Sequence, residues 1–153
     1  MRWIMTVYKV ERVTKHSDEL DMFLKETCPA ISEMFGSKFN HERAAVHHMI
    51  NKGYFLIGRR NGEIRGIHIS WLMFSPLDMT KKILHQQLFY VKPDSGRMAY
   101  HLFEKFIDIG KAEADHIITM LTSRANIKPC TLESKGFKML EVLYRLEVSK
   151  WLS

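Results

Sequence analysis

The chain has 153 residues, 46% of them hydrophobic and 26% charged, with a formal net charge of +6. This composition is that of one globular domain, so we expect residues 1–153 to form a single domain. No apolar run reaches the roughly 18 residues of a spanning helix, and the N-terminal residues lack the pattern of a signal peptide. The two cysteines, Cys28 and Cys130, predict no disulfide framework, which favours a reduced, cytoplasmic protein without a membrane partner.

The basic residues are scattered, with short pairs at Arg59-Arg60 and Lys81-Lys82. A nucleic-acid-binding face would show longer basic blocks with aromatic residues between them. We therefore favour an ordinary solvated surface over a nucleic-acid partner, and a polyanionic small ligand also fits the charge.

The first third of the chain predicts one strand and two helices. Residues 5–10 alternate and are rich in β-branched side chains, as in a strand. Ser17 is a predicted N-cap, and the helix after it is expected to end or kink at Pro29. A second helix is expected over 40–51, closed by Gly53.

A hairpin follows, because Asn61-Gly62 between apolar runs predicts a tight turn joining strands at 54–57 and 63–74. After a break at 75–78 the pattern predicts a strand over 83–91. The remaining segments predict, in order, a helix over 96–114, a strand over 116–121, a short helix over 126–134 and a last strand over 137–148.

The element order β-α-α-β-β-β-α-β-α-β predicts an α/β (α+β) fold. The unit from 83 to 121 requires a crossover and a locally parallel strand pair, whereas the hairpin before it supplies antiparallel neighbours. We therefore expect a mixed, mostly antiparallel sheet of six to seven strands with helices on both faces.

The turn between the strand over 83–91 and the helix after it is the first functional candidate. Asp94, Ser95 and Gly96 open directly onto that helix. The free N–H groups of a helix N-terminus form an anion site, most often for phosphate.

The element order and several motifs resemble the GNAT superfamily of acyl-CoA N-acyltransferases. Residues 90–94 (YVKPD) resemble the family's exit from its fourth strand, and the turn is similar to that of small phage-encoded members. Lys135-Gly136-Phe137, with Asn126 and Leu132 before it, resembles the family's C-terminal signature. The family's pyrophosphate loop, Q/R-x-x-G-x-G/A, is degenerate here, since in residues 94–99 (DSGRMA) only the last position matches well.

The resemblance implies that acetyl-CoA is the cosubstrate, without a metal, and that the fourth strand, the loop and Asn126 bind it. A backbone N–H at a bulge of the fourth strand would polarise the thioester carbonyl. Arg97 can add a charge-assisted contact to a phosphate. The implied binding residues are Leu88, Phe89, Tyr90, Val91, Asp94, Ser95, Gly96, Arg97, Met98, Ala99 and Asn126.

Transfer to a primary amine needs a base for the ammonium proton and benefits from an acid for the departing thiolate. His85 on the strand is the candidate base, and a structural or surface role is its alternative. Glu133 stands where the family often has a tyrosine, and it could serve as acid if burial raised its pKa. His41, His47 and His48 lack the spacing of a metal site.

The sequence thus predicts an acetyl-CoA-dependent N-acetyltransferase acting by direct attack on the thioester. The alternative is a non-catalytic protein of the same fold with a binding or structural role, for example in a virion. A small-molecule or protein amine would be the acceptor, and an exposed last strand could pair across a homodimer. Small amines, aminoglycosides, polyamines, protein N-termini and lysines all stay open as acceptors.

Overall fold

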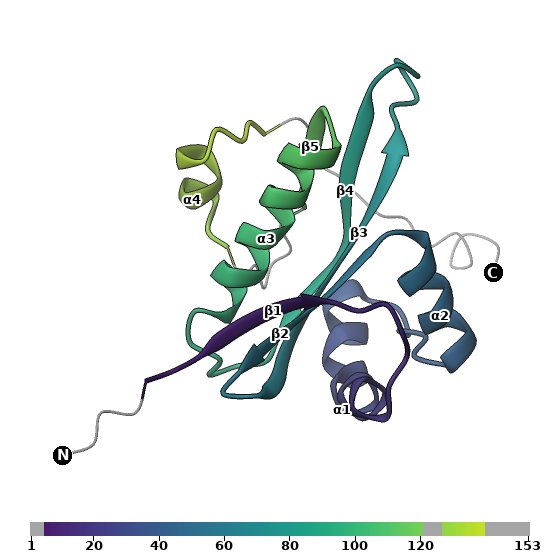
Figure 1. Cartoon of the computed structure of the whole chain (residues 1–153), viewed down its shortest axis with the longest axis vertical. Helices are drawn as coiled ribbons and strands as arrows, with labels where there is room; N and C mark the ends of the chain where they lie inside the picture. Colours follow the sequence, from purple (N-terminus) through teal and green to yellow (C-terminus); the bar gives the residue numbers. More distant parts are fainter. Residues whose placement is uncertain (1–4, 121–126, 140–153) are drawn as a thin grey trace, which may run out of the picture.

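A computed structural model describes residues 5–120 and 127–139 and shows a sheet with helices packed on both faces (Figure 1). The elements, in chain order, are β1 (Tyr8–Arg12), α1 (Asp18–Phe35), α2 (Arg43–Lys52), β2 (Tyr54–Arg60), β3 (Glu63–Phe74), β4 (Lys82–Val91), α3 (Met98–Glu113), β5 (His116–Ile118) and α4 (Pro129–Ser134).

The sheet has the strand order β1-β2-β3-β4-β5. Strands β1 to β4 pair antiparallel, and β4 pairs with β5 in parallel, as the crossover predicted. The mixed, mostly antiparallel fold class is confirmed, but the described sheet has five strands instead of six to seven. Residues 137–139 are not a strand, and 140–148 lie outside the described residues.

Local signals place the first helices. The Ser17 hydroxyl accepts a hydrogen bond from Leu20 N (3.2 Å), and Gly36 ends α1 in the left-handed conformation. Helix α1 does not end at Pro29, one of the two outcomes expected there, because it continues to Phe35. Burial of Ile31 and packing of Phe35 against the core offset the hydrogen bond that proline cannot donate.

Two hydrophobic cores lie on opposite sides of the sheet (Figure 1). The first joins α1 and α2 to one face through Leu24, Val46 and Ile69. The second joins α3 and α4 to the other face through Phe103, Phe106 and Leu132.

Helix α3 lies very close to the sheet at its N-terminal end. Gly58 and Gly66 face each other on β2 and β3. A Cβ on Gly58 would stand 2.4 Å from Met98 Cε, and one on Gly66 would stand 2.9 Å from Leu102. These glycines therefore let the first turns of α3 settle onto the strands and fix where the helix begins.

Several boundaries shift by a few residues from the sequence expectations. Helix α2 begins at Arg43 instead of residue 40, and α3 begins at Met98 instead of residue 96. Strand β5 ends at Ile118 instead of residue 121. Within the described ranges, no helix is both long and apolar enough to cross a membrane.

Candidate functional site

Strands β4 and β5 run side by side for a short distance and then part. Their register pairs are Ile83 with His116, Leu84 with Ile117 and His85 with Ile118. Beyond His85, β4 continues to Val91 with β3 on one side and no paired strand of the described chain on the other. The free edge of β4 therefore opens toward the start of α3.

The side chain of Gln86 explains why the strands part. Its Oε1 accepts a hydrogen bond from the Thr119 hydroxyl (2.7 Å), and its Nε2 donates to the carbonyl of Met120 (3.0 Å). A carboxamide standing between two backbones keeps them farther apart than a main-chain ladder would. Gln86 thus acts as a spacer at the point where the sheet opens.

A buried histidine supports this spacer. His68 Nε2–H donates to Gln86 Oε1 (3.3 Å), and the imidazole lies between the rings of Phe89 and Phe106, with centroids 4.9 and 4.3 Å away. The side chain is 0% exposed, and desolvation lowers the pKa of His68 to about 3. His68 is therefore neutral at physiological pH and stiffens the sheet beneath the opening.

A β-bulge follows directly. Ile69 pairs with Leu88 and Ser70 with Gln86, so Gln87 is the extra residue on β4. A bulged residue leaves the ladder and re-aims its neighbours. The structure thus has a bulge in β4, the strand in which the resemblance implied one.

His85 makes a specific contact with this bulge. Gln87 Nε2 donates to His85 Nδ1 (2.9 Å). In this arrangement the neutral imidazole carries its proton on Nε2, so its basic lone pair is the one that Gln87 covers. His85 can accept a proton at Nδ1 once the carboxamide turns away.

The loop between β4 and α3 is held by arginines from neighbouring strands. Arg65 donates to the Ser95 hydroxyl (2.8 Å) and to the carbonyl of Pro93 (2.7 Å), and Arg60 donates to the carbonyl of Asp94 (2.9 Å). Asp94 and Gly96 have positive φ values of 59° and 60°. The loop is therefore fixed in one shape before any ligand arrives.

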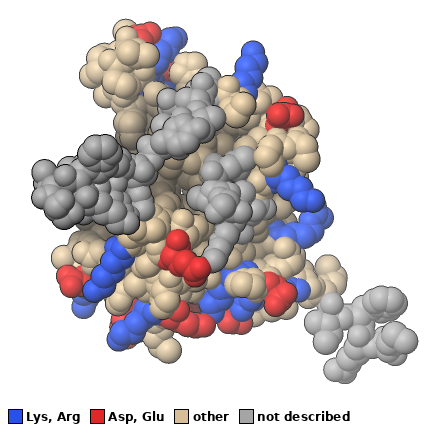
Figure 2. Space-filling model, turned by 180° about the vertical axis from the view of Figure 1, so that it is seen from behind, with Lys and Arg blue, Asp and Glu red and all other residues tan. Residues whose placement is uncertain are grey.

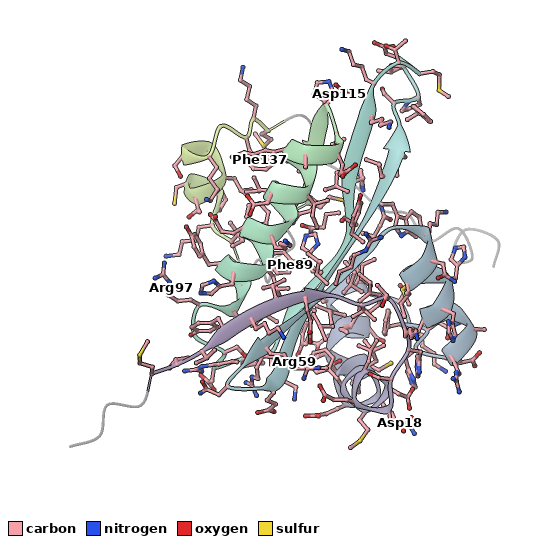
Figure 3. All side chains as sticks on the ribbon, viewed as in Figure 1. Asp18, Arg59, Phe89, Arg97, Asp115 and Phe137 are labelled. Atoms are coloured by element: carbon pink, nitrogen blue, oxygen red, sulfur yellow. The ribbon has the colours of Figure 1, made fainter. Side chains whose placement is uncertain are left out.

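The side chains of this loop divide into two groups. Ser95 and Met98 turn inward and are buried, whereas Gly96 and Arg97 are exposed. Arg97 extends outward from the start of α3 (Figure 3). Within the described chain, the amides of Gly96 and Ala99 have no hydrogen-bond acceptor, so they are available to an anion.

One loop amide already has a partner that the sequence did not reveal. The hydroxyl of Tyr8, from β1, accepts a hydrogen bond from Arg97 N (3.0 Å), and its ring stacks on His101 with centroids 4.5 Å apart. The phenolic proton of Tyr8 makes no hydrogen bond within the described part of the chain. Tyr8 can therefore pass a hydrogen bond from the loop to an anion.

The predicted cofactor-binding residues on β4 point to different faces of the sheet. Leu88 is buried against α1 and α2, Phe89 is buried against α3, and Tyr90 and Val91 are half-buried. Any contact that these strand residues make with a cosubstrate is thus mainly through the backbone. Asn126 lies outside the described residues.

The two catalytic candidates lie on opposite sides of the sheet. His85 faces Trp71 on the α1–α2 side, whereas α4, which carries Glu133, packs through Leu132 on the α3 side. Glu133 is exposed, so the burial on which its role as an acid depended is absent.

A hollow of about 190 Å³ opens beside the bulge, between β4 and the α1–α2 connection. The connection is pinned at Phe39, whose N–H donates to Ser32 Oγ (2.8 Å) and whose carbonyl accepts from Cys28 Sγ (3.4 Å). The sequence contained no motif for this hollow. Its lining is Phe35, residues 37–40, Gln87 and Leu88.

Comparisons with known proteins identify the fold. No protein-family model matches the chain, and no curated protein sequence is similar to it. Among solved structures, a probable acetyltransferase has a TM-score of 0.69 and 17% identity over 91% of this chain and 97% of that chain. The chain therefore shares the fold of this structure, as the resemblance predicted.

Two further neighbours are named with a ligand or substrate class. An aminoglycoside acetyltransferase from an uncultured soil metagenomic sample has a TM-score of 0.62 and 21% identity, over 92% of this chain and 97% of that chain. A predicted acetyltransferase from Clostridium acetobutylicum, solved with acetyl-CoA, has a TM-score of 0.63 and 14% identity, over 95% and 98%.

Proposed function

We propose that this protein is an acetyl-CoA-dependent N-acetyltransferase that transfers the acetyl group directly to a primary amine. The observation that carries the proposal is the parting of β4 from β5 after His85, with a preformed anion loop at the far end of the free β4 edge. An open strand edge presents N–H and C=O groups to an extended ligand, as in strand addition. The pantetheine arm of coenzyme A has amide groups that suit this edge.

The loop supplies the contacts for the diphosphate. The free amides of Gly96 and Ala99 and the dipole of α3 favour an anion there. Tyr8 adds a hydroxyl proton, and the exposed guanidinium of Arg97 adds a positive charge.

The chemistry takes place at the bulge. The amine nitrogen attacks the thioester carbonyl carbon, a C–N bond forms, the C–S bond breaks and the thiolate leaves. A main-chain N–H near Gln87 or Leu88 polarises the carbonyl oxygen. His85, after release from Gln87, or a water molecule takes the amine proton. A thiol with a pKa of about 8.5 is an adequate leaving group without a buried acid, which agrees with the exposed position of Glu133.

A non-catalytic protein of the same fold is the second candidate. The contact of Tyr8 with the Arg97 amide favours it, since a hydroxyl that stays there occupies one of the phosphate donors. A nucleic-acid-binding role is less well supported. On the face shown in Figure 2, Lys and Arg side chains intermingle with Asp and Glu and form no continuous basic band among the residues drawn in colour.

Calorimetric titration with acetyl-CoA tests the proposal, followed by measurement of thiol release with a panel of primary amines. We expect saturable binding of acetyl-CoA and a higher melting temperature in its presence. Binding without amine-dependent thiol release would support the non-catalytic candidate. No binding at millimolar acetyl-CoA would contradict the proposed transferase.

A further inference from the structure

We infer that the hollow beside the β4 bulge selects a small amine that also carries a carboxylate and an apolar body, such as an apolar amino acid, over a polycationic amine. This inference rests on the proposed function, because it assigns the hollow to the acceptor. The transfer reaction does not determine which amine is accepted, and the residues that line the hollow do.

The position of the hollow connects it to the reaction. Gln87 and Leu88 form one wall, and Gln87 is the extra residue of the bulge. An amine bound in the hollow therefore lies beside the backbone that would polarise the thioester. On the same side, His85 contacts Gln87, so a proton acceptor stands near this wall.

The size of the hollow favours a small acceptor. At about 190 Å³ it is smaller than the roughly 300–1,000 Å³ typical of sites for drug-sized ligands. The α1–α2 connection cannot easily retreat to enlarge it, since both backbone polar groups of Phe39 are bonded to side chains of α1. A multi-ring amino sugar could not be enclosed in this space.

The apolar wall indicates what the body of the acceptor is. Phe35 and Phe39 are half-buried and pack against the first core, and Leu88 is buried beside them. These side chains present a hydrocarbon surface that stabilises an apolar group by removing it from water.

The charge of the lining indicates the second functional group. Lys38 is the charged member of the lining, and it has no ion-pair partner among the described residues. The lining contains no carboxylate. Several carboxylates elsewhere are already paired: Glu11 and Glu19 with Arg59, Glu26 with Lys92, and Glu104 with Lys135.

A polycation such as spermidine or an aminoglycoside needs acidic partners to offset the desolvation of its ammonium groups. This lining offers a positive charge instead. An acceptor carboxylate, in contrast, can pair with Lys38, while Ser37 and Asn40 supply polar groups at the rim. The walls therefore favour a zwitterionic amine.

The experiment compares three amines with saturating acetyl-CoA: L-phenylalanine, phenethylamine, which lacks only the carboxylate, and spermidine. We expect kcat/KM to be highest for phenylalanine and lowest for spermidine. Lys38→Ala should lower kcat/KM for phenylalanine about fivefold, and Lys38→Glu about tenfold or more. Phenethylamine should respond less than phenylalanine to either change.

Lys105→Glu is the matched control, because it makes the same charge change at an exposed position of α3, on the other side of the sheet. It should leave the preference among the three amines unchanged. Equal responses to Lys38→Glu and Lys105→Glu, or a preference for spermidine in the unaltered protein, would overturn the inference while leaving the transferase in place.

Binding of the same amines, measured by NMR line broadening without acetyl-CoA, separates the two proposals. Selective binding of phenylalanine that Lys38→Glu abolishes would support the inference even if no acetyl group were transferred. Absence of acetyl-CoA binding would instead contradict the proposed function. If no preference for phenylalanine appeared in either assay, the assignment of the hollow would be wrong.

Discussion

The two sides of the sheet are built on different principles. On the α3 side, polar groups are buried and bonded to one another, as His68 and Gln86 are, and the loop is clamped by arginines. On the α1–α2 side, the hollow is open to solvent and Lys38 in its lining is exposed. Under the proposed function, the rigid side would hold the cosubstrate and the open side would set the identity of the acceptor.

The largest expected effect is the pH dependence of stability that His68 produces on the α3 side of the sheet. The pKa of His68 is about 3 in the folded protein and about 6.5 when unfolded. Between these values the unfolded chain binds a proton that the folded chain excludes. The contribution of His68 to the free energy of unfolding should therefore fall by about 1.4 kcal/mol for each pH unit between about 6.5 and about 3, and should be constant above about 6.5.

Urea unfolding at several pH values measures this slope. His68→Gln should flatten it, whereas His48→Gln, at an exposed position of α2, should not. Identical slopes in the unaltered protein and in His68→Gln would show that His68 is accessible to protons in the folded state.

The second effect sharpens the contrast at the loop. A Cβ on Gly96 would lie 2.2 Å from the Tyr8 hydroxyl, and the φ of Gly96 is 60°. We expect Gly96→Ala to destabilise the protein by about 2–3 kcal/mol and to abolish acetyl-CoA binding. Gly62→Ala is the control, because its φ is 85° but a Cβ there meets nothing within 4 Å. It should cost about 1 kcal/mol and leave binding intact.

The third effect tests the spacer between β4 and β5. Gln86→Leu removes the bonds to Thr119 and Met120, so it should destabilise the protein by about 1–2 kcal/mol. Hydrogen exchange should speed up at β5 more than at β2. If Gln87→Leu, which leaves the spacer bonds in place, accelerated exchange at β5 equally, the role of Gln86 would be refuted.

The smallest expected effect shows whether the Tyr8 hydroxyl assists or obstructs the binding of acetyl-CoA. Tyr8→Phe removes the hydroxyl and keeps the stack on His101. We expect acetyl-CoA to bind about three- to tenfold more weakly, the value of one hydrogen bond. Tyr54→Phe, at a half-buried position of β2, is the control in the same titration. Tighter binding by Tyr8→Phe would mean that the hydroxyl blocks the loop, as the non-catalytic candidate requires.

Local patterns in the sequence predicted much of the fold. The Asn61-Gly62 turn, the Ser17 cap and the crossover from β4 through α3 to β5 each depend on residues close together in the chain. The early end of β5 could not be predicted, because it depends on Gln86, which is far from Thr119 in sequence. Helix α1 continues past Pro29 for a similar reason, since tertiary packing outweighs the local preference of proline.

Only the part of the candidate site formed by residues contiguous in the sequence could be predicted. Residues 94–99 were expected to form an anion loop; the structure shows positive φ values at Asp94 and Gly96, and anion binding stays a prediction. Tyr8 and Arg65 reach the loop from other strands, and no spacing rule connects them with it. The hollow likewise depends on how the α1–α2 connection meets β4, which only the folded chain shows.

Apart from the Gln86 spacer, the opening between β4 and β5 is lined by main-chain groups of β4 that have no neighbouring strand among the described residues. An opening of this kind depends on the arrangement of the strands more than on individual side chains, so extensive substitution can leave it in place. This accounts for a chain that shares its architecture with acetyltransferases at 17% identity while no family model matches it. Searches for distant members of this fold would gain from scoring interrupted strand pairing as well as residue motifs.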